Sequence, residues 1–306
     1  MADRPASRPN VHPALRVPLI GGGPVSGDWH SVRWTSEGIP VLVSDPDHYL
    51  AQVGADIDAP LDGSSFGSLA YLARYLPLLL APNAPLRRAI RGALQRHVPI
   101  PVALAVELGC GVGADLRTLA DVAHAVIGVD LSIAGLRAAQ RQLAGEPVPL
   151  LARVEGRSFR SDDPIHLPAV EDVFLVVGNA LDPPLFPEVA DIVCVVNLLD
   201  TVPDPLTLVG QADAVLKPGG LFILTSPLSW NEEITEPEDA LGGGTAEGWA
   251  QLGTAAGLAL LLQGQLPVLP HLRYEILEQT DVPWSLREHS RSVTTYDVHV
   301  LVARKL

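Results

Sequence analysis

The chain has 306 residues but only two cysteines and one methionine, and 5% of its residues are aromatic. Cys110 and Cys194 cannot supply a disulfide framework, and their spacing matches no metal site. Both are interpreted as reduced thiols. The longest apolar run, near residues 257–262, is far shorter than the ~20 residues that cross a bilayer. No apolar signal-peptide stretch follows the arginines of residues 1–10. These absences predict a cytoplasmic protein without a membrane segment.

Positive charge is also scarce. The 21 Lys and Arg residues face 35 Asp and Glu residues, for a formal net charge of −14. A nucleic-acid substrate is therefore not expected, because phosphate backbones require a basic face. The basic cluster of Arg87, Arg88, Arg91 and Arg96 is interpreted as the solvated face of a helix. The expected partner is a small molecule, and the sequence leaves the oligomeric state open.

What the chain does have is an alternation of strands and helices. The 47% of hydrophobic residues can bury a large core. Apolar runs typical of strands covered on both faces occur at 102–108, 123–129, 173–177, 191–196 and 221–225, before β-rich segments at 274–278 and 294–303. Helical periodicity occurs at 63–80, 85–96, 132–143 and 205–216. The alternation predicts an α/β fold with a mostly parallel sheet and helices on both faces.

The segment VALAVELGCGVGAD, residues 102–115, joins the first strand to a glycine turn. Gly109, Gly111 and Gly113 let the backbone bend sharply and leave no Cβ where a ligand would press against it. The free N–H groups of the following helix point to the same place. Asp130 ends the second strand 21 positions after Gly109 (130 − 109), close to the spacing at which a carboxylate reaches a ribose hydroxyl.

Glu107 precedes this turn, where an acid suits a ligand with an ammonium group better than a pyrophosphate. The segment ELGCGVG at 107–113 resembles the first motif of the class I S-adenosylmethionine-dependent methyltransferases. Four further segments resemble that family in order: VDLS at 129–132, GNAL at 178–181, DIVCVVN at 191–197 and VLKPGGL at 215–221. The resemblance covers about residues 100–227. It implies a Rossmann-like seven-stranded sheet with the last strand antiparallel, S-adenosyl-L-methionine as cofactor and S-adenosyl-L-homocysteine as product.

The resemblance also implies the cofactor-binding residues, which are Glu107, Gly109, Cys110, Gly111, Gly113, Asp130, Leu131, Asn179, Ala180, Leu181 and Asn197. A nicotinamide enzyme is the alternative, but its turn reads G-x-G-x-x-G, whereas this chain has G-x-G-x-G. Cys110 is not expected to act as a nucleophile, because methyl transfer from a sulfonium needs none.

Residues 1–60 are expected to form an N-terminal extension with a small β hairpin, and 61–306 the methyltransferase domain. Helices within 61–98 are expected to cover the cofactor and the acceptor, and two inserts lie near 145–171 and 228–270. The segment EGIPVL at 37–42 resembles the tail of a small zinc-ribbon module that precedes some methyltransferases. The cysteines of that module are absent, so no metal is expected.

The acceptor is expected at the carboxyl ends of strands four and five, where ligands of open α/β sheets bind. NLLDTVPDPLTL at 197–208 resembles a turn of the protein-histidine N-methyltransferases. The mercaptohistidine N-methyltransferase domain of ovothiol biosynthesis is similar there and also in TSPLSWNEEIT at 225–235, LGG at 241–243 and DVPWSLREH at 281–289. The resemblance implies an imidazole nitrogen as acceptor. It departs at the inserts, at the N-terminus and at Leu228, which replaces an aromatic residue.

An imidazole acceptor gives several residues chemical roles. A neutral imidazole, with an unperturbed pKa of about 6.5, has a free lone pair at pH 7. A carboxylate on the far ring nitrogen favours the charge that develops during transfer. Asp200 is the candidate for this catalytic role, with Asn197 orienting the ring or the cofactor. The alternative for Asp200 is a capping or turn carboxylate.

The candidate substrate-binding residues each have a structural alternative. Five aromatic residues would either line the acceptor pocket or pack in the core: Tyr71, Tyr75, Trp230, Trp284 and Tyr296. Arg287 would bind a carboxylate or form an ion pair, while Glu232 and Glu233 would bind an ammonium or cap the insert.

The sequence therefore predicts an S-adenosylmethionine-dependent N-methyltransferase with a small histidine-like acceptor. One alternative is the same fold acting on another amine, hydroxyl or carboxyl of a natural product, which the inserts favour. Another is a protein that binds the cofactor without catalysis and serves as a partner subunit.

Overall fold

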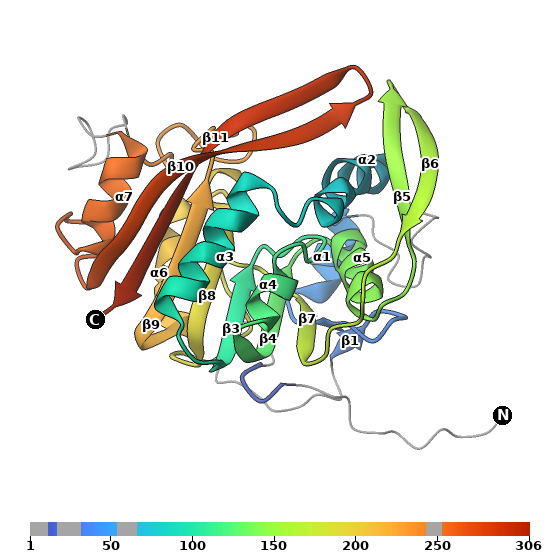
Figure 1. Ribbon diagram of the computed structural model, residues 1–306. Coiled ribbons are helices and arrows are strands. Elements are labelled where there is room, and N and C mark those ends of the chain that lie inside the picture. Colours follow the sequence, from blue (N-terminus) through green and yellow to red (C-terminus); the bar gives the residue numbers. More distant parts are fainter. Residues whose placement is uncertain (1–11, 17–31, 54–65, 243–252) are drawn as a thin grey trace.

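The computed structural model describes residues 12–16, 32–53, 66–242 and 253–306. A nine-stranded sheet in the order β1-β2-β7-β4-β3-β8-β9-β11-β10 forms its centre, and a hairpin of β5 and β6 stands apart from it (Figure 1). The strands are β1 Arg33–Trp34, β2 Pro40–Val41, β3 Val102–Leu108, β4 Ala123–Asp130, β5 Val148–Glu155, β6 Ser158–Ile165, β7 Val173–Val177, β8 Ala190–Val196, β9 Leu216–Ser226, β10 Tyr274–His289 and β11 Ser292–Lys305. The α-helices and the short 3₁₀ helices, the latter labelled η, are α1 Pro46–Val53, α2 Phe66–Tyr75, η3 Leu76–Leu80, α3 Pro85–His97, α4 Leu116–Ala120, α5 Ile133–Leu143, η4 Leu199–Thr201, α6 Pro205–Val215 and α7 Thr254–Leu262.

The central strands run in the directions that the sequence predicts. The five strands β7, β4, β3, β8 and β9 run parallel to one another. The last strand, β11, is antiparallel to both β9 and β10. The strands from β7 to β10 in the sheet order are therefore the expected seven, and the Rossmann-like α/β fold is confirmed.

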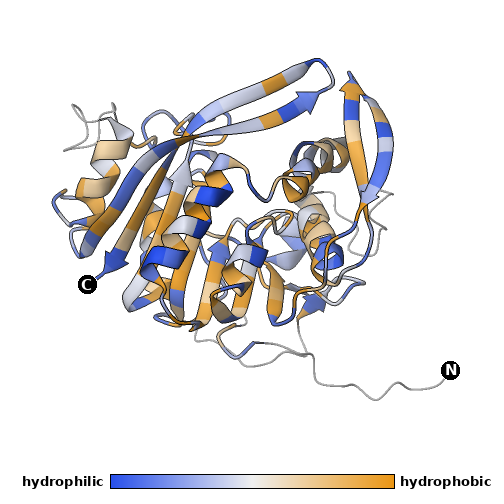
Figure 2. Ribbon diagram, in the orientation of Figure 1, coloured by the Kyte–Doolittle hydropathy of each residue, from blue (hydrophilic) through white to orange (hydrophobic). Residues whose placement is uncertain are grey.

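Two apolar layers cover the sheet, one on each face, because alternate residues of the strands point to opposite sides. Val106 of β3 packs in the layer that includes α6 and α7. Its neighbour Ala105 packs in the layer that includes α3, α4 and α5. Figure 2 shows the central strands as the most hydrophobic part of the molecule. The carboxyl ends of the parallel strands meet at one edge of this core.

Several element boundaries differ from the expected ones. The helix expected at 63–80 is an α-helix that ends at Tyr75, followed by the 3₁₀ turn η3 with Pro77 near its start. The strand expected at 274–278 continues to His289, and its partner β11 is equally extended. The two form a long hairpin whose tip projects beyond the sheet (Figure 1). The 145–171 insert, whose secondary structure was not predicted from the sequence, contains the β5–β6 hairpin.

The two hairpins touch at their tips. Ser290, in the turn between β10 and β11, donates from its N–H to the carbonyl of Arg153 at 3.0 Å and from its hydroxyl to that of Val154 at 2.6 Å. Arg74 of α2 forms an ion pair of 2.8 Å with Glu288 of β10. The hairpins and α2 therefore form a continuous roof over the carboxyl edge of the sheet.

The N-terminal extension adds the strands β1 and β2 to the side of the sheet next to β7, at the far end from β10. The expected hairpin is present in its described part, since Arg33–Trp34 pair with Pro40–Val41. Parts of three expected segments lie outside the described residues. They are residues 29–31 of the hairpin, 63–65 at the start of the helix expected at 63–80, and 243–244 of the insert near 228–270. Among the described helices, none has the length and apolar character needed to span a membrane.

Candidate active site

The glycine turn between β3 and α4 is tied to the end of β4. The N–H of Gly111 donates to Oδ2 of Asp130 at 2.7 Å, and the N–H of Ser132 donates to Oδ1 at 2.6 Å. Gly109 and Gly111 have φ values of +79° and +53°, which residues with a side chain rarely adopt. A Cβ on Gly111 would lie 2.8 Å from the Tyr71 hydroxyl. Hydrogen bonds therefore hold the turn against Asp130, and a residue with a side chain would not fit at Gly111.

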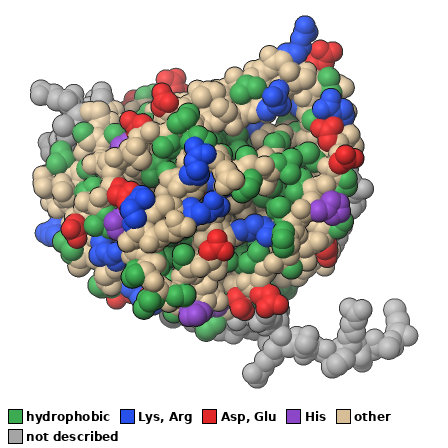
Figure 3. Space-filling view, viewed as in Figure 1, with side chains coloured by type: hydrophobic (Ala, Val, Ile, Leu, Met, Phe, Trp, Pro, Cys, Tyr) green, Lys and Arg blue, Asp and Glu red, His purple; other side chains and the backbone are tan. Residues whose placement is uncertain are grey.

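A cavity of about 630 Å³ opens above this turn. Its floor is the turn with the ends of β3, β4 and β8, one wall is α2, η3 and the start of α3, and β10 closes it with Pro283, Trp284 and Ser285. Figure 3 shows hydrophobic side chains gathered around the hollow beneath the β10–β11 hairpin. The volume lies within the range of small-molecule sites, ~300–1,000 Å³.

Much of the expected site lines this cavity. The residues that do so are Tyr71, Tyr75, Glu107, Gly109, Cys110, Gly111, Asp130 and Asn197. Gly113 instead lies where the turn packs on α5, since a Cβ there would be 2.9 Å from that of Ala139. Burial raises the pKa of the Cys110 thiol. A protonated thiol agrees with the expectation that Cys110 is no nucleophile.

Three charged side chains meet beside the turn. Glu107 is 2% exposed, and its Oε2 has no hydrogen-bond partner among the described residues. Nε of Arg87 donates to Oδ1 of Asp115 at 3.2 Å, and Nη1 of Arg87 donates to the carbonyl of Leu78 at 2.5 Å. Burial, with the charges of Asp115 and Asp130, raises the pKa of Glu107, whereas the charge of Arg87 lowers it. An unpartnered buried carboxylate next to a guanidinium can hold an amino-acid group by its ammonium and its carboxylate.

Arg87 corrects the interpretation of the basic cluster as a solvated face. Its side chain is 9% exposed and lines the cavity, while Arg88 is exposed. The sequence held a signal for this, because Arg87 is three and seven positions before Ile90 and Leu94 and shares their buried stripe. Asp115 is the second residue that the sequence reasoning missed.

The turn after β7 lies next to Asp130, because β4 and β7 are neighbours in the sheet. The N–H of Gly178 donates to the carbonyl of Asp130 at 3.0 Å. Within the turn, the N–H of Leu181 donates to Oδ1 of Asn179 at 2.9 Å, and Ala180 is buried. Leu131 is 43% exposed beside the acid. The residues expected to hold a nucleoside are therefore brought together at this edge.

Four of the five aromatic candidates form two pairs, and three of these four, Tyr71, Tyr75 and Trp284, line the cavity. The rings of Tyr71 and Tyr75 lie 4.7 Å apart, and those of Trp284 and Tyr296 lie 5.8 Å apart. Burial raises the pKa of both tyrosines of α2. Their phenols therefore stay protonated at neutral pH and act as hydrogen-bond donors.

Hydrogen bonds join the residues after β8 to those at the end of β9 and just beyond it. Asn197 has a φ of +51°, and its Oδ1 accepts from the hydroxyl of Thr225 at 2.9 Å. Asp200 is 3% exposed and accepts the N–H of Ser229 at 2.9 Å through Oδ2, while Oδ1 has no partner among the described residues. Asp200 is not among the residues that line the cavity. Its catalytic role therefore stays a prediction.

The other expected acceptor residues lie away from the cavity lining. Trp230, with a φ of +27°, is partly buried against the layer of α6 and α7. Glu232 and Glu233 are exposed in the loop after β9, and Arg287 is exposed on β10. Glu288, the next residue on β10, pairs with Arg74 of α2 and not with Arg287.

Comparison with known proteins identifies a methyltransferase domain, whose family model matches residues 106–224. The comparison with curated proteins finds no match. Among solved structures, the chain is similar to a SAM-dependent methyltransferase from Aquifex aeolicus, with 10% identity, a TM-score of 0.46, and 79% of this chain and 100% of that chain covered. It is similar to a SAM-dependent methyltransferase from Methanosarcina mazei, with 19% identity, a TM-score of 0.46 and coverage of 70% and 96%. A third is the putative methyltransferase in a complex with the Trm112 methyltransferase activator from Haloferax volcanii, with 17% identity, a TM-score of 0.45 and coverage of 70% and 87%.

Proposed function

We propose that this chain, which is an S-adenosylmethionine-dependent methyltransferase, methylates a nitrogen of a small, flat and largely uncharged acceptor. An imidazole ring, as the sequence predicts, is the first candidate in that class. The observation that carries the proposal is the division of the cavity into a charged part at the glycine turn and an apolar, aromatic part.

The charged part fits the cofactor. The unpartnered Oε2 of Glu107 would accept an N–H of the α-ammonium, and Arg87 would bind the α-carboxylate. Asp130 keeps lone pairs for the ribose hydroxyls, since a carboxylate has about four acceptor sites and the two backbone N–H groups use two. The turn at 178–181 would hold the adenine. When bound, the cofactor supplies a methyl group on a positively charged sulfur.

The raised pKa of Glu107 makes cofactor binding pH-dependent. An ammonium favours the ionised carboxylate, so the pKa of Glu107 falls on binding and a proton is released between the bound and free values. We expect the affinity for S-adenosylhomocysteine to increase as the pH rises towards the free-state pKa of Glu107. Calorimetric titration below pH 8, in buffers of different ionisation enthalpy, measures the released proton. Glu107→Gln should abolish this release, and an unchanged release in that variant would contradict the assignment.

Among the described residues, the acceptor part contains no carboxylate or imidazole that could act as a general base. Outside the charged group, the lining is made by apolar side chains such as Leu78, Leu198 and Trp284, by hydroxyls and by the amide of Asn197. Ser285 shares a hydrogen bond of 2.8 Å with Thr295, and Thr201 donates to the carbonyl of Leu198 at 3.0 Å. An alcohol acceptor must lose its proton, whereas a neutral ring nitrogen already has a lone pair. This supports a nitrogen acceptor.

The placement of the charged residues also limits which acceptor molecules the cavity can bind. Free histidine carries an ammonium and a carboxylate, but Glu232 and Arg287 are exposed and do not line the cavity. Burying either charge without a partner would be costly. An imidazole or related nitrogen heterocycle on an uncharged scaffold is therefore favoured over the free amino acid.

The residues of this chain would promote transfer by alignment and by excluding water. Tyr75 and Trp284 would hold a flat ring by its faces. With its oxygen engaged by Thr225, Asn197 has its amide N–H groups left to donate at the end of β8. The roof, closed by the Ser290 contacts, would keep solvent away from the reacting nitrogen.

The experiment is an assay of S-adenosylhomocysteine release with a panel of acceptors. The panel contains N-acetylhistidine amide, free histidine, a histidine-containing peptide, other uncharged nitrogen heterocycles, phenols and carboxylic acids. We expect turnover of uncharged nitrogen heterocycles, with kcat/KM at least about tenfold above that of free histidine. Turnover confined to phenols or carboxylic acids would overturn the acceptor class. Tight cofactor binding with no product from any acceptor would favour a non-catalytic partner protein.

Trp284→Ala tests the acceptor wall itself. Loss of a stacking partner worth about 0.5–1.5 kcal/mol beyond its buried area should raise the acceptor KM about tenfold and leave the affinity for S-adenosylhomocysteine within about twofold. Val293→Ala, at a residue that is 50% exposed on the same hairpin, is the matched control. An unchanged acceptor KM in Trp284→Ala would remove this residue from the acceptor site.

A further inference from the structure

The N-terminal extension contacts both loops that are assigned to the adenosine half of the cofactor. Its described parts are residues 12–16 and 32–53. Neither part contributes to the motifs from which the cofactor site was predicted, and no residue of either lines the 630 Å³ cavity. Their contacts nevertheless converge on the turn after β7 and on the segment after β4.

The first contact braces the chain that follows the turn after β7. The N–H of Arg16 donates to the carbonyl of Pro184 at 3.0 Å, and the N–H of Phe186 donates to that of Ala14 at 3.0 Å. Nη2 of Arg16 forms an ion pair of 2.7 Å with Asp182 and donates to the carbonyl of Pro183 at 3.2 Å. Asp182 in turn donates its N–H to the carbonyl of residue 179 at 3.1 Å. The Arg16 side chain is therefore one hydrogen bond away from the turn assigned to the adenine.

The second contact lies on the strand before the same turn. Val41 of β2 pairs in parallel with Val177, the last residue of β7. The N–H of Leu42 donates to the carbonyl of Val177 at 2.8 Å. The turn at 178–181 is consequently held from the extension on both sides.

The third contact lies next to Asp130, the residue assigned to the ribose hydroxyls and called the ribose acid below. The hydroxyl of Tyr49, from α1, donates to the carbonyl of Leu131. Burial and the charge of Asp130 raise the pKa of this phenol, so it remains a donor at neutral pH. Leu131 directly follows Asp130, so Tyr49 restrains the backbone on which the ribose acid depends.

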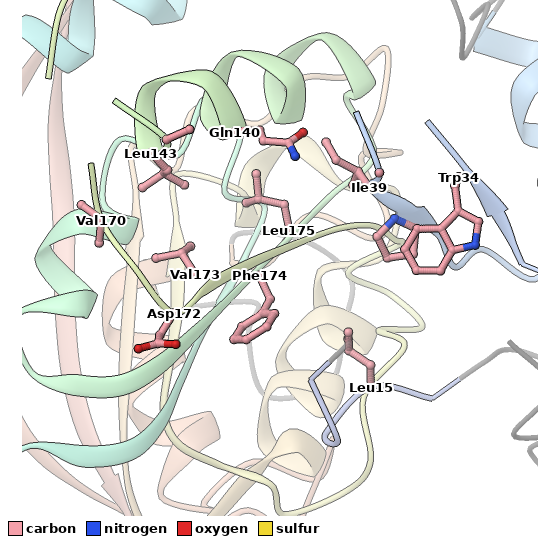
Figure 4. Close-up of a pocket in the computed structure, with 13 residues that line it drawn as sticks. Leu15, Trp34, Ile39, Gln140, Leu143, Val170, Asp172, Val173, Phe174 and Leu175 are labelled. Atoms are coloured by element: carbon pink, nitrogen blue, oxygen red, sulfur yellow. The ribbon is translucent and has the colours of Figure 1, made fainter. Parts of the chain in front are cut away.

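The extension also docks through apolar residues such as Leu15, Ile39 and Leu42, which are buried in the core of the sheet. Among the described residues, a hollow of about 300 Å³ separates Leu15, Trp34 and Ile39 of the extension from Leu143 and Phe174 (Figure 4). The polar contacts of Arg16 and Tyr49 act on the loops themselves, apart from this apolar packing. The loss of Arg16 or Tyr49 should therefore be felt at the loops that they hold.

We infer that the extension is part of the cofactor site, with Arg16 and Tyr49 as positioning residues for the adenine turn and the ribose acid. The inference rests on the cofactor placement proposed above, but not on the identity of the acceptor. It concerns binding, so a failure to find an acceptor leaves it testable.

The test is calorimetric titration of the full chain with S-adenosylhomocysteine, and competition by 5′-methylthioadenosine, which lacks the amino-acid group. One hydrogen bond contributes ~0.5–1.5 kcal/mol, so Arg16→Ala and Tyr49→Phe should each weaken both ligands by about three- to tenfold. Arg16→Lys, which keeps the charge opposite Asp182, should recover part of the loss. The KM for S-adenosylmethionine should rise while kcat at saturation stays the same.

Two controls separate positioning from folding. Arg33→Ala removes an exposed ion pair of 2.6 Å with Asp47, inside the extension, and should leave both affinities unchanged. Glu107→Gln should weaken S-adenosylhomocysteine but not 5′-methylthioadenosine. The inference is overturned if Arg16→Ala and Tyr49→Phe bind both ligands within twofold of the wild type. It is also overturned if they weaken only S-adenosylhomocysteine, or if their losses appear only in melting temperature.

Discussion

Asp130→Ala is expected to weaken the binding of S-adenosylhomocysteine by at least about a hundredfold. Hydrogen bonds to a charged group contribute ~1.5–3 kcal/mol each, and in the proposed placement of the cofactor Asp130 would accept two from the ribose. The same carboxylate holds the N–H groups of Gly111 and Ser132. Its removal therefore also loosens the glycine turn at the point where the cofactor would rest. Burial raises the pKa of Asp130, while these N–H groups lower it.

The measurement is calorimetric titration, with circular dichroism and thermal melting to confirm the fold. Asp121→Ala is the matched control, because Asp121 is an exposed acid that follows α4 and should leave the affinity unchanged. Asp130→Asn should show an intermediate loss, since an amide keeps one acceptor oxygen. A wild-type affinity in Asp130→Ala would remove this residue from the cofactor site.

Arg87→Met is expected to give the largest loss of folding stability. The side chains of Arg87 and Asp115 are 9% and 11% exposed, and removing one partner leaves a buried charge uncompensated. Breaking such a pair costs about 3–5 kcal/mol of unfolding free energy. Denaturant unfolding of the single variant measures this loss.

The double variant Arg87→Met/Asp115→Asn separates stability from binding. With neither member of the ion pair charged, the unfolding free energy should return to within about 1 kcal/mol of the wild type. The affinity for S-adenosylhomocysteine should nevertheless stay reduced, because the carboxylate of the ligand has lost its guanidinium, while 5′-methylthioadenosine should bind normally. A single variant as stable as the wild type would contradict the buried pair, and full affinity in the double variant would contradict the binding role.

The parts of the fold that could be predicted are those determined by short segments of sequence, such as apolar runs, glycine turns and helix-capping residues. Continuous apolar strands and a glycine turn with positive φ at Gly109 and Gly111 follow from the residues themselves. Asp130 lies at the end of its strand for the same reason. Ser132, a residue type that favours the N-cap position of a helix, caps α5 through its hydroxyl, which accepts the N–H of Gly135 at 3.1 Å.

The hairpins escaped prediction because they lack a continuous buried face. In β6 the burial pattern is mostly exposed, so no clear alternation marks the strand. The outer half of β10 likewise leaves the sheet, and its register is set by β11 alone. Gly156, with a φ of +51°, was the local signal of a turn between β5 and β6.

Which side chains reach the cavity could not be predicted for a related reason. A motif resemblance places Arg287 near Trp284 in sequence, but they are an odd number of positions apart on one strand and so face opposite sides. Asp200 was assigned from the resemblance of the turn at 197–208, whereas its hydrogen bond to Ser229 depends on how the loop after β9 folds back. Such side-chain directions are set by tertiary contacts and not by the local sequence.

The central claim is that the cavity at the glycine turn holds the cofactor with its amino-acid group at Glu107 and Arg87 and its adenine at the turn after β7. A crystal structure with S-adenosylhomocysteine tests it most directly. The account predicts the ribose hydroxyls on Asp130, the α-ammonium within hydrogen-bond distance of Glu107 and the adenine against residues 179–181. A ligand bound in the reverse orientation, or in any other cavity, would contradict it.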